Sequence, residues 1–280
     1  MGPSRRPRPQ AKLTRAALLA TVPIALGAVA FAFSGASAQS LPGLQISVEP
    51  LSVEFSLAPG NAASTPLTIK NVGSEKAVIV ITPLDWRSSL DGTVRTERPG
   101  AEGDASLSSY LRVSAAEAAL APGEMRRLDL SLSLPATFSA TPRDYRGGYL
   151  VRAVPASANR TSAFGVGANV LVYETVGGAQ RHLRLTDLEV QRDGAHGAKL
   201  VARLVNDGRT YVRPQMHVLI AQGPRIVASR DDSTPAILAG EPRHLERTLG
   251  NLPSGSYIAQ LTIDYGGPTL VRGTTSFTVP

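Results

Sequence analysis

The sequence predicts an all-β protein with two β-sandwich domains behind an N-terminal signal peptide. Three observations favour this fold class: short runs of alternating apolar and polar residues fill most of the chain, turn-forming residues separate these runs, and helical periodicity is nearly absent after residue 38. The clearest run is residues 128–134, in which four leucines alternate with Asp129, Ser131 and Ser133. Such alternation is typical of a strand with one buried and one exposed face.

The first 38 residues have the pattern of a secretory signal peptide. Five basic residues and no acidic ones precede an apolar run over residues 16–33. Ala36 and Ala38 then present the small side chains that a signal peptidase accepts. We expect cleavage after Ala38. An uncleaved membrane anchor is the alternative, because the apolar run approaches the ~20 residues that span a bilayer.

The net charge of the chain falls once this segment is removed. The full sequence has 29 basic and 22 acidic residues, a net charge of +7. Without the five basic residues of the leader the balance is 24 to 22, which gives no electrostatic basis for a nucleic-acid partner. No later apolar run is long enough to span a membrane. We therefore expect an exported product without stable membrane insertion, in the periplasm or, alternatively, at the cell surface.

The expected strands follow one another along the mature chain, separated by Gly, Pro, Asn and Asp clusters. In order they are residues 46–55, 67–71, 78–84, 128–134, 149–154, 164–173, 183–190, 200–206, 211–220, 257–265 and 270–279. A long loop is expected between residues 87 and 109, where polar residues, Pro and Gly accumulate. Residues 115–119 are expected to be a loop as well.

A loose internal repeat suggests that one sandwich plan occurs twice. A strand ends in Asn-x-Gly at Asn71 and again at Asn206, and each copy is followed later by a short Leu-Ala-(Pro)-Gly-Glu turn. Dividing the chain at Gly177-Gly178 gives a signal peptide over 1–38, a first domain over 39–178 and a second over 179–280. Both lengths suit immunoglobulin-like sandwiches of ~100 residues, the first with insertions.

Two tyrosines are interpreted as structural. Tyr257 comes just after the Gly-containing corner 252–256 at the start of a late strand, which is the pattern of a tyrosine corner in β-sandwiches. Its hydroxyl is expected to bond nearby backbone. Tyr149, after Gly147-Gly148, is a weaker match to the same pattern in the first domain.

The sequence offers no constellation that predicts catalysis. The four histidines are scattered over the second domain without the spacing of metal ligands, and no nucleophile elbow, phosphate-binding loop or calcium loop occurs. Asp231-Asp232 lies in a turn-like stretch and is interpreted as solvated. The absence of cysteine excludes a disulfide scaffold, thiolate metal sites and a cysteine nucleophile. We therefore expect no enzyme, and no catalytic, cofactor or metal site.

The strand expected over residues 164–173 carries the most informative pattern. One of its faces holds alternating apolar residues: Phe164, Val166, Ala168, Val170 and Val172. The simpler interpretation is a strand with one buried face and two outward apolar residues. The alternative is a sheet edge that offers backbone hydrogen bonds and a row of apolar side chains to an incoming polypeptide.

Several motifs together resemble the first domain of PapD-like periplasmic pilus-assembly chaperones, over most of residues 45 to 175. They are Ile46-Ser47-Val48-Glu49-Pro50, Ala58-Pro59-Gly60, 67–71, Leu120-Ala121-Pro122-Gly123-Glu124, 128–134 and 143–152. The Asn206 turn resembles that family's second domain to a smaller degree. The resemblance implies two immunoglobulin-like domains that cap secreted fibre subunits by lending them the last strand of the first domain, here residues 164–173.

The family also anchors the carboxylate of its client with an Arg in the first strand and a Lys in the lending strand. In this chain residues 51–54 contain no Arg and residues 164–173 contain no Lys. The candidates to replace that anchor pair are Arg152, Arg181 and Arg184.

The leading hypothesis is therefore an exported chaperone that binds secreted pilus, fimbrial or surface-fibre subunits by strand addition, with an outer-membrane usher as a further expected partner. The alternative is an envelope or cell-surface scaffold whose immunoglobulin-like modules bind wall polymer or partner proteins. Residues 147–149 resemble a strand of the WxL-interacting surface proteins, which belong to that second class. An accessory domain of an enzyme is a third interpretation.

Overall fold

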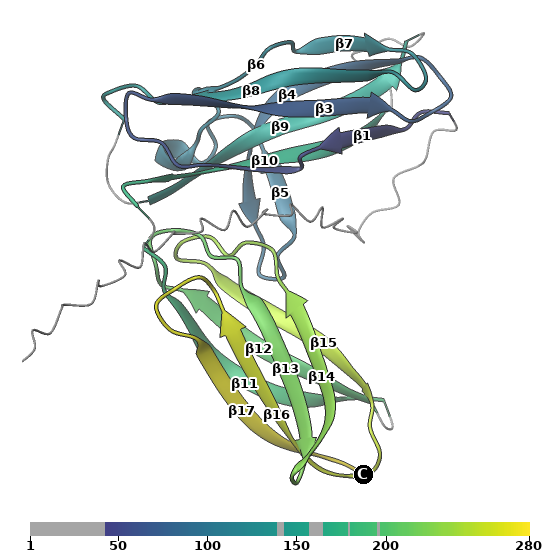
Figure 1. Cartoon of the computed structure of the whole chain (residues 1–280), viewed down its shortest axis with the longest axis vertical. Helices are drawn as coiled ribbons and strands as arrows, with labels where there is room; N and C mark the ends of the chain where they lie inside the picture. Colours follow the sequence, from purple (N-terminus) through teal and green to yellow (C-terminus); the bar gives the residue numbers. More distant parts are fainter. Residues whose placement is uncertain (1–42, 139–142, 157–164, 179, 195–196) are drawn as a thin grey trace, which may run out of the picture. The chain divides into compact units, whose positions relative to one another are not determined.

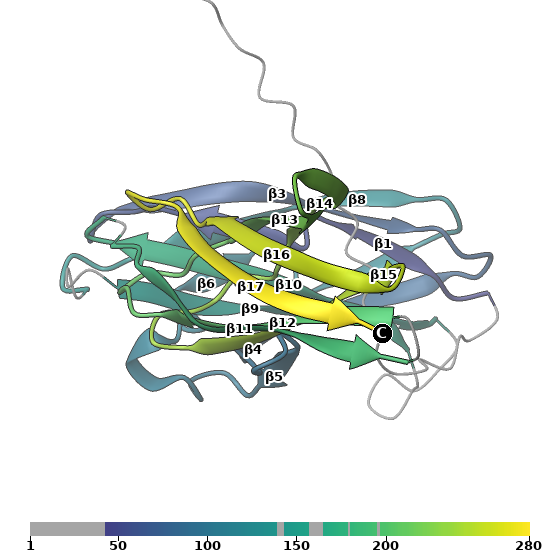
Figure 2. The same cartoon turned by 90° about the horizontal axis from the view of Figure 1, so that it is seen from below.

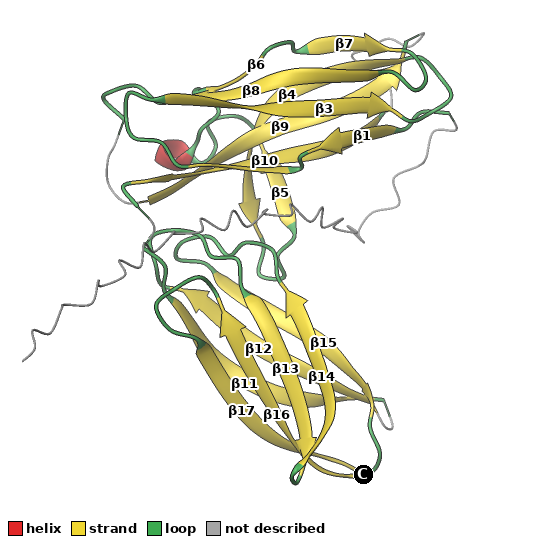
Figure 3. Cartoon of the chain, in the orientation of Figure 1, coloured by secondary structure: helices red, strands yellow, loops and turns green. Residues whose placement is uncertain are grey.

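A computed structural model describes residues 43–138, 143–156, 165–178, 180–194 and 197–280. The expected signal peptide lies outside the described residues. Strands make up nearly all regular structure, and the one short 3-10 helix, η1 (Gly103–Ala105), is the red element in Figure 3. No helix among the described residues is long and apolar enough to cross a membrane. The predicted all-β class is confirmed.

Ten strands from the first part of the chain form two facing sheets. They are β1 (Ile46–Glu49), β2 (Ser52–Phe55), β3 (Ala62–Asn71), β4 (Ala77–Ser88), β5 (Val94–Glu97), β6 (Leu111–Val113), β7 (Glu117–Leu120), β8 (Met125–Ser133), β9 (Arg143–Pro155) and β10 (Val166–Val176). One sheet has the order β1-β3-β8-β6, and the other has the order β2-β10-β9-β4-β5 with β7 also paired to β4. Figure 1 shows β1, β3 and β8 side by side.

Seven strands from the rest of the chain form a second pair of sheets. They are β11 (Leu183–Asp193), β12 (Gly197–Asn206), β13 (Gln215–Gln222), β14 (Arg225–Ser233), β15 (Pro242–Asn251), β16 (Gly255–Asp264) and β17 (Val271–Val279). Their orders are β11-β12-β15 and β14-β13-β16-β17. In Figure 2, β16 and β17 run next to each other along their length. The named strands thus pair in two separate sets, while the chain from Gln39 to Pro280 forms one compact unit. The domain boundary at Gly177-Gly178 stays a prediction.

Each pair of sheets encloses its own apolar core. The leucine face predicted for residues 128–134 is confirmed, because Leu128, Leu130, Leu132 and Leu134 are all buried in the first core. The tyrosine corner is confirmed as well. Tyr257 is buried in the second core, and its hydroxyl donates a hydrogen bond to the carbonyl oxygen of Pro253 at 2.6 Å.

The run 46–55, expected as one strand, is divided between both sheets. Residues 46–49 pair with β3, whereas residues 52–55 pair with β10 in the opposite sheet. Pro50 lies between them, and a proline has no N–H to donate to a continuous ladder. Alternation predicted the strand but carries no information on which sheet each half joins.

Other expected loops contain strands. The loop 87–109 includes the end of β4, β5 and η1, and the loop 115–119 includes β7. Asp231 and Asp232 lie on β14 rather than in a turn. Conversely, residues 211–214 at the start of the expected strand 211–220 form only an isolated bridge at Val212. Short or polar edge strands lack the apolar alternation on which the expectation rested.

The repeated Asn-x-Gly motif forms the same hydrogen-bonded structure in both pairs of sheets. Asn71, at the end of β3, is fully buried. Its Nδ2 donates to the carbonyl oxygens of Glu75 at 2.7 Å and Leu120 at 3.1 Å, and its Oδ1 accepts from the N–H of Gly73 at 3.0 Å. The backbone N–H of Gly123 donates to the carbonyl oxygen of Asn71 at 2.9 Å.

Asn206, at the end of β12, repeats this arrangement with equivalent partners. Its Nδ2 donates to the carbonyl oxygens of Thr210 at 2.9 Å and Ile237 at 2.8 Å. Its Oδ1 accepts from the N–H of Gly208 at 2.9 Å, and the N–H of Gly240 donates to its carbonyl oxygen at 2.8 Å. We refer to these two arrangements as the Asn71 latch and the Asn206 latch. They support the interpretation of the sequence repeat as two copies of one plan.

Candidate functional site

The strand β10 has one complete neighbour and one incomplete neighbour. It pairs with the antiparallel strand β9 along its whole length, from Val166 opposite Ala153 to Val176 opposite Arg143. On its other side the parallel strand β2 pairs only with residues 171–174. Among the described residues, 166–170 therefore have no strand on that side. A strand with unpaired N–H and C=O groups is a template for another chain.

The backbone groups that point to this open side can be assigned from one hydrogen bond. The N–H of Leu171 donates to the carbonyl oxygen of Leu51 at 2.9 Å, on the β2 side of β10. Backbone direction alternates along a strand, so the N–H and C=O of Asn169 and Gly167 point to the same side as those of Leu171. These two residues lie in the part of β10 that β2 does not reach.

The apolar side chains predicted on one face of this strand become less buried toward its open end. Val170 and Val172 are completely buried in the first core. Val166 and Ala168 are only partly buried and pack against the same core. Phe164 lies outside the described residues. An added strand next to residues 166–170 has apolar surface left to cover at Val166 and Ala168, whereas the buried side chain of Val170 leaves none.

Glycine allows β9 and β10 to approach closely beside the open segment. A Cβ at Gly148 on β9 would overlap the carbonyl oxygen of Val170, and a Cβ at Gly167 on β10 would lie 3.0 Å from the carbonyl oxygen of Val151. The tight pairing with β9 fixes the position of the open edge. This packing gives a physical reason for Gly148, whereas a Cβ at Gly147 would instead lie 3.1 Å from the Cβ of Leu107.

A buried carboxylate holds the chain after β2 against β10. Glu174 is fully buried, and its Oε1 accepts a hydrogen bond from the N–H of Leu57 at 2.7 Å. Its Oε2 has no hydrogen-bond partner. Burial raises the pKa of the Glu174 carboxyl above its ordinary value, and the Leu57 hydrogen bond opposes this effect. Alternation alone gave no signal for a carboxylate on the apolar face of this strand.

The three arginines proposed as a carboxylate anchor lie in different places. Arg152 is on β9, directly opposite Gly167 in the open segment of β10. Arg181 is exposed, in the segment that precedes β11. The Nε of Arg184 donates to Asp207 Oδ2 at 2.6 Å, in an exposed ion pair. Only Arg152 is thus next to the unpaired part of β10.

Sequence reasoning missed a fourth arginine near the end of β2. The Nε of Arg213 donates to Glu54 Oε1 at 2.7 Å, and its Nη2 donates to Ser52 Oγ at 3.1 Å. The guanidinium also lies over the ring of Tyr173, 4.8 Å from its centroid. Arg213 therefore holds β2 in place through the side chains of Ser52 and Glu54. The Arg-Pro sequence at 213–214 carried no signal for this contact.

A second arrangement missed from the sequence is a Ser-His-Asp set on neighbouring strands. His217 on β13 pairs through Nδ1 with Asp231 Oδ1 at 2.6 Å, and its Nε2 lies 3.3 Å from Ser229 Oγ on β14. The Asp231 side chain is 90% exposed. Catalytic carboxylates of this type are buried, with oxyanion donors beside the serine. These three side chains lie on an exposed sheet surface, so we interpret them as a surface hydrogen-bonded pair with a neighbouring serine. No group of metal-binding side chains gathers within the described parts of the chain.

Comparison with known proteins returns pilus chaperones among the solved structures. The class 5 fimbriae chaperone CfaA is 14% identical with a TM-score of 0.42, and the match covers 84% of this chain and all of that one. The YadV chaperone is 10% identical, covering 83% and 99%, with a TM-score of 0.44. The Pseudomonas aeruginosa CupB2 chaperone is 13% identical, covering 83% and 100%, with a TM-score of 0.41. No family model and no curated protein sequence matches the chain.

Proposed function

We propose that this protein is an exported, periplasmic chaperone that binds secreted fibre subunits by strand addition to β10. The observation that carries the proposal is that no described strand pairs with residues 166–170 on the side where β2 covers only residues 171–174. An extended segment of a client placed there gains main-chain hydrogen bonds from Gly167 and Asn169. Its inward side chains cover the exposed parts of Val166 and Ala168.

The position of Arg152 supports a second contact with the client. Its strand neighbour across the ladder is Gly167, which has no side chain to separate the guanidinium from a chain lying along the edge. A carboxylate is the natural partner of a guanidinium. We propose Arg152, ahead of Arg181 and Arg184, as the anchor for a client carboxylate. An outer-membrane usher remains a further proposed partner.

The test removes one main-chain donor at the edge. Asn169→Pro deletes an N–H that points to the open side and leaves the β9 ladder intact, because proline is tolerated where no ladder bond is lost. Asn169→Ala is the matched control, since it loses the same side chain and keeps the N–H. Both variants are expressed in a strain that lacks the native gene. The exported fibre subunits whose amounts fall when the gene is deleted are then quantified in the exported compartment.

We expect wild type and Asn169→Ala to maintain the subunits, and Asn169→Pro to lower their level about tenfold, as for loss of strand pairing. Thermal unfolding of each purified variant checks that Asn169→Pro is folded. Equal subunit levels with the two folded variants rule out strand addition at this edge.

A further inference from the structure

The first pair of sheets contains an open pocket that strand addition does not use. It has a volume of about 600 Å³ and is formed by the loop from β5 to β6 and by the segment that follows β8. Pockets of this size accommodate small ligands. We propose that this pocket binds a neutral saccharide.

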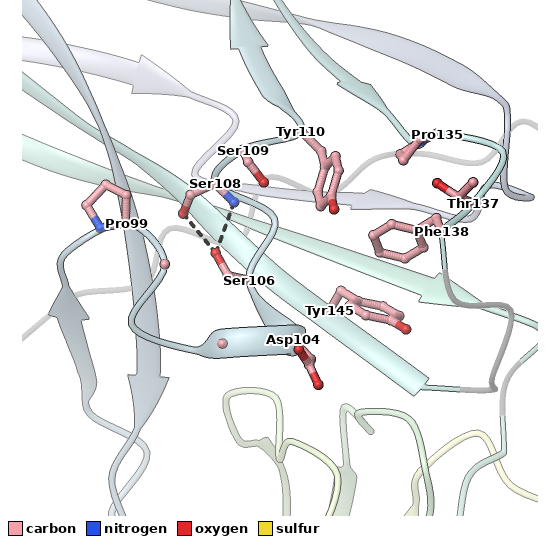
Figure 4. A pocket seen from close by; sticks show the side chains of 12 residues that line it. Pro99, Asp104, Ser106, Ser108, Ser109, Tyr110, Pro135, Thr137, Phe138 and Tyr145 are labelled. Atoms are coloured by element: carbon pink, nitrogen blue, oxygen red, sulfur yellow. Dashed lines mark hydrogen bonds between the residues drawn. The ribbon is translucent and has the colours of Figure 1, made fainter.

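Aromatic side chains form one wall of the pocket. Figure 4 shows Tyr110, Phe138 and Tyr145 grouped together, with Pro99 on the opposite side. Phe138 lies between the two tyrosines, with ring centroids 5.1 Å from Tyr110 and 4.7 Å from Tyr145. Tyr110 and Phe138 keep part of their surface exposed. The electron-rich faces of such rings attract the polarised C–H groups of a sugar ring.

Hydroxyl groups line the rest of the pocket. They belong to Ser106, Ser108, Ser109 and Thr137, and Asp104 adds one carboxylate. Ser106 and Ser108 already donate to a buried carboxylate, whereas Ser109, Thr137 and Asp104 are exposed. An entirely apolar ligand would strip water from these three without replacing their hydrogen bonds, which is costly. A ligand with hydroxyls of its own replaces them.

The charge of the lining argues against an anionic ligand. Among the described side chains that line the pocket, Asp104 is the only charged one, and it is exposed. None of these described side chains is a Lys or Arg that could pair with a phosphate or carboxylate. An uncharged polyhydroxy molecule with apolar ring faces matches the aromatic wall, the hydroxyls and the single carboxylate together.

A buried carboxylate fixes the loop that frames the pocket before any ligand arrives. Asp85 is fully buried on β4. Its Oδ2 accepts from the N–H of Glu102 at 3.0 Å, and its Oδ1 accepts from Ser106 Oγ at 2.8 Å and from Ser108 Oγ. The N–H of Leu107, which is also fully buried, donates to the backbone of β9. Because the lining serines are held in place, little ordering is needed on binding.

The test is titration of the purified chain with N,N′,N″-triacetylchitotriose, cellotriose and maltotriose, followed by calorimetry or ligand-observed NMR. We expect at least one of the three to bind. Ser109→Trp fills the pocket from an exposed position without removing core packing, and Ser276→Trp, at an exposed site on β17, is the matched control. Binding should disappear with Ser109→Trp and persist with Ser276→Trp. Tyr110→Ala should weaken binding about tenfold, in line with loss of an aromatic contact.

Absence of binding by all three sugars at millimolar concentration overturns the proposal. Binding that survives Ser109→Trp overturns it as well, since the sugar then lies elsewhere. Tetramethylammonium is titrated in parallel, and binding of this cation without any sugar shows that the rings and Asp104 form a site for a cationic group instead. The result is independent of β10, so strand addition stands or fails separately. A positive result extends the protein's partners to polysaccharide of the envelope.

Discussion

The two pairs of sheets share one hydrogen-bonded device and differ in what surrounds it. The Asn71 latch and the Asn206 latch have the same donors, acceptors and spacing, from the glycine two residues later to the carbonyl four residues later. By contrast, within the described residues only the first pair has a loop held by the buried carboxylate of Asp85. Its last strand, β10, pairs with β2 over four residues and is open before them. We assign the two repeated latches to the stability of the fold. We place the functional sites at the loop held by Asp85 and at the open edge of β10, which are not repeated.

The edges of the two last strands also differ in chemistry. β17 ends the second sheet order with Arg272, threonines and serine exposed along it. Charged and hydroxyl-bearing side chains discourage pairing with another chain. The open segment of β10 has glycine at 167, Asn169 and three aliphatic residues. The edge of β10 is thus a better template for an incoming strand than the edge of β17.

The largest expected effect is the loss of either latch. Asn71→Ala and Asn206→Ala each leave two carbonyl oxygens without their donor, one of which is only part-buried in the Asn71 latch, and we expect a loss of about 3 kcal/mol in the free energy of unfolding for each. Urea denaturation of both variants measures this. If one variant loses almost no free energy of unfolding and the other loses much, the two latches are not equivalent.

A smaller effect of opposite sign is expected at Glu174 in the first pair of sheets. Its pKa is raised by burial, so the unfolded chain ionises first as pH rises through the ordinary value of 4.5. The destabilisation from Glu174 is therefore absent at low pH and develops above that value.

Glu174→Gln removes the ionisation and keeps an oxygen for the N–H of Leu57. We expect it to raise the free energy of unfolding at pH 7 by about 1 kcal/mol, the order of a desolvated polar group. The gain should vanish near pH 4. Urea titrations at both pH values check this, and a gain that does not depend on pH contradicts the burial of a charge at Glu174.

The smallest effect is expected at the tyrosine corner of the second core. Tyr257→Phe removes the hydroxyl that donates to Pro253 and preserves the ring, so we expect a loss of about 0.5 kcal/mol in the free energy of unfolding. Thermal or urea unfolding measures it. An unchanged stability indicates that water donates to the carbonyl oxygen of Pro253 in place of the hydroxyl at no cost.

The sequence predicted the parts of the fold that local pattern controls. The leucines of β8, the Asn-x-Gly repeat and Tyr257 each depend on spacing within a few residues, and the structure confirms them. The sheet switch at Pro50 was not predictable in the same way, because alternation continues through it. Which sheet a strand joins depends on contacts distant in the chain.

The candidate site shows the same division. The apolar face of residues 166–172 was visible as alternation, but the extent of β2 was not, and it is β2 that decides which part of β10 is open. Arg213 bonds to Glu54, which lies 159 positions away in the sequence. Asp85 bonds to Ser106, which lies 21 positions away. No local pattern marks such partners.

The open edge of β10 is tested most directly by amide hydrogen exchange measured by NMR on the protein alone. Leu171, whose N–H is bonded to Leu51, should exchange slowly. Gly167 and Asn169 point to the same side without a strand partner, and we expect their amides to exchange about 100-fold faster, as exposed amides do relative to bonded ones. Equal protection of all three amides contradicts the account, because it means that the edge is already covered.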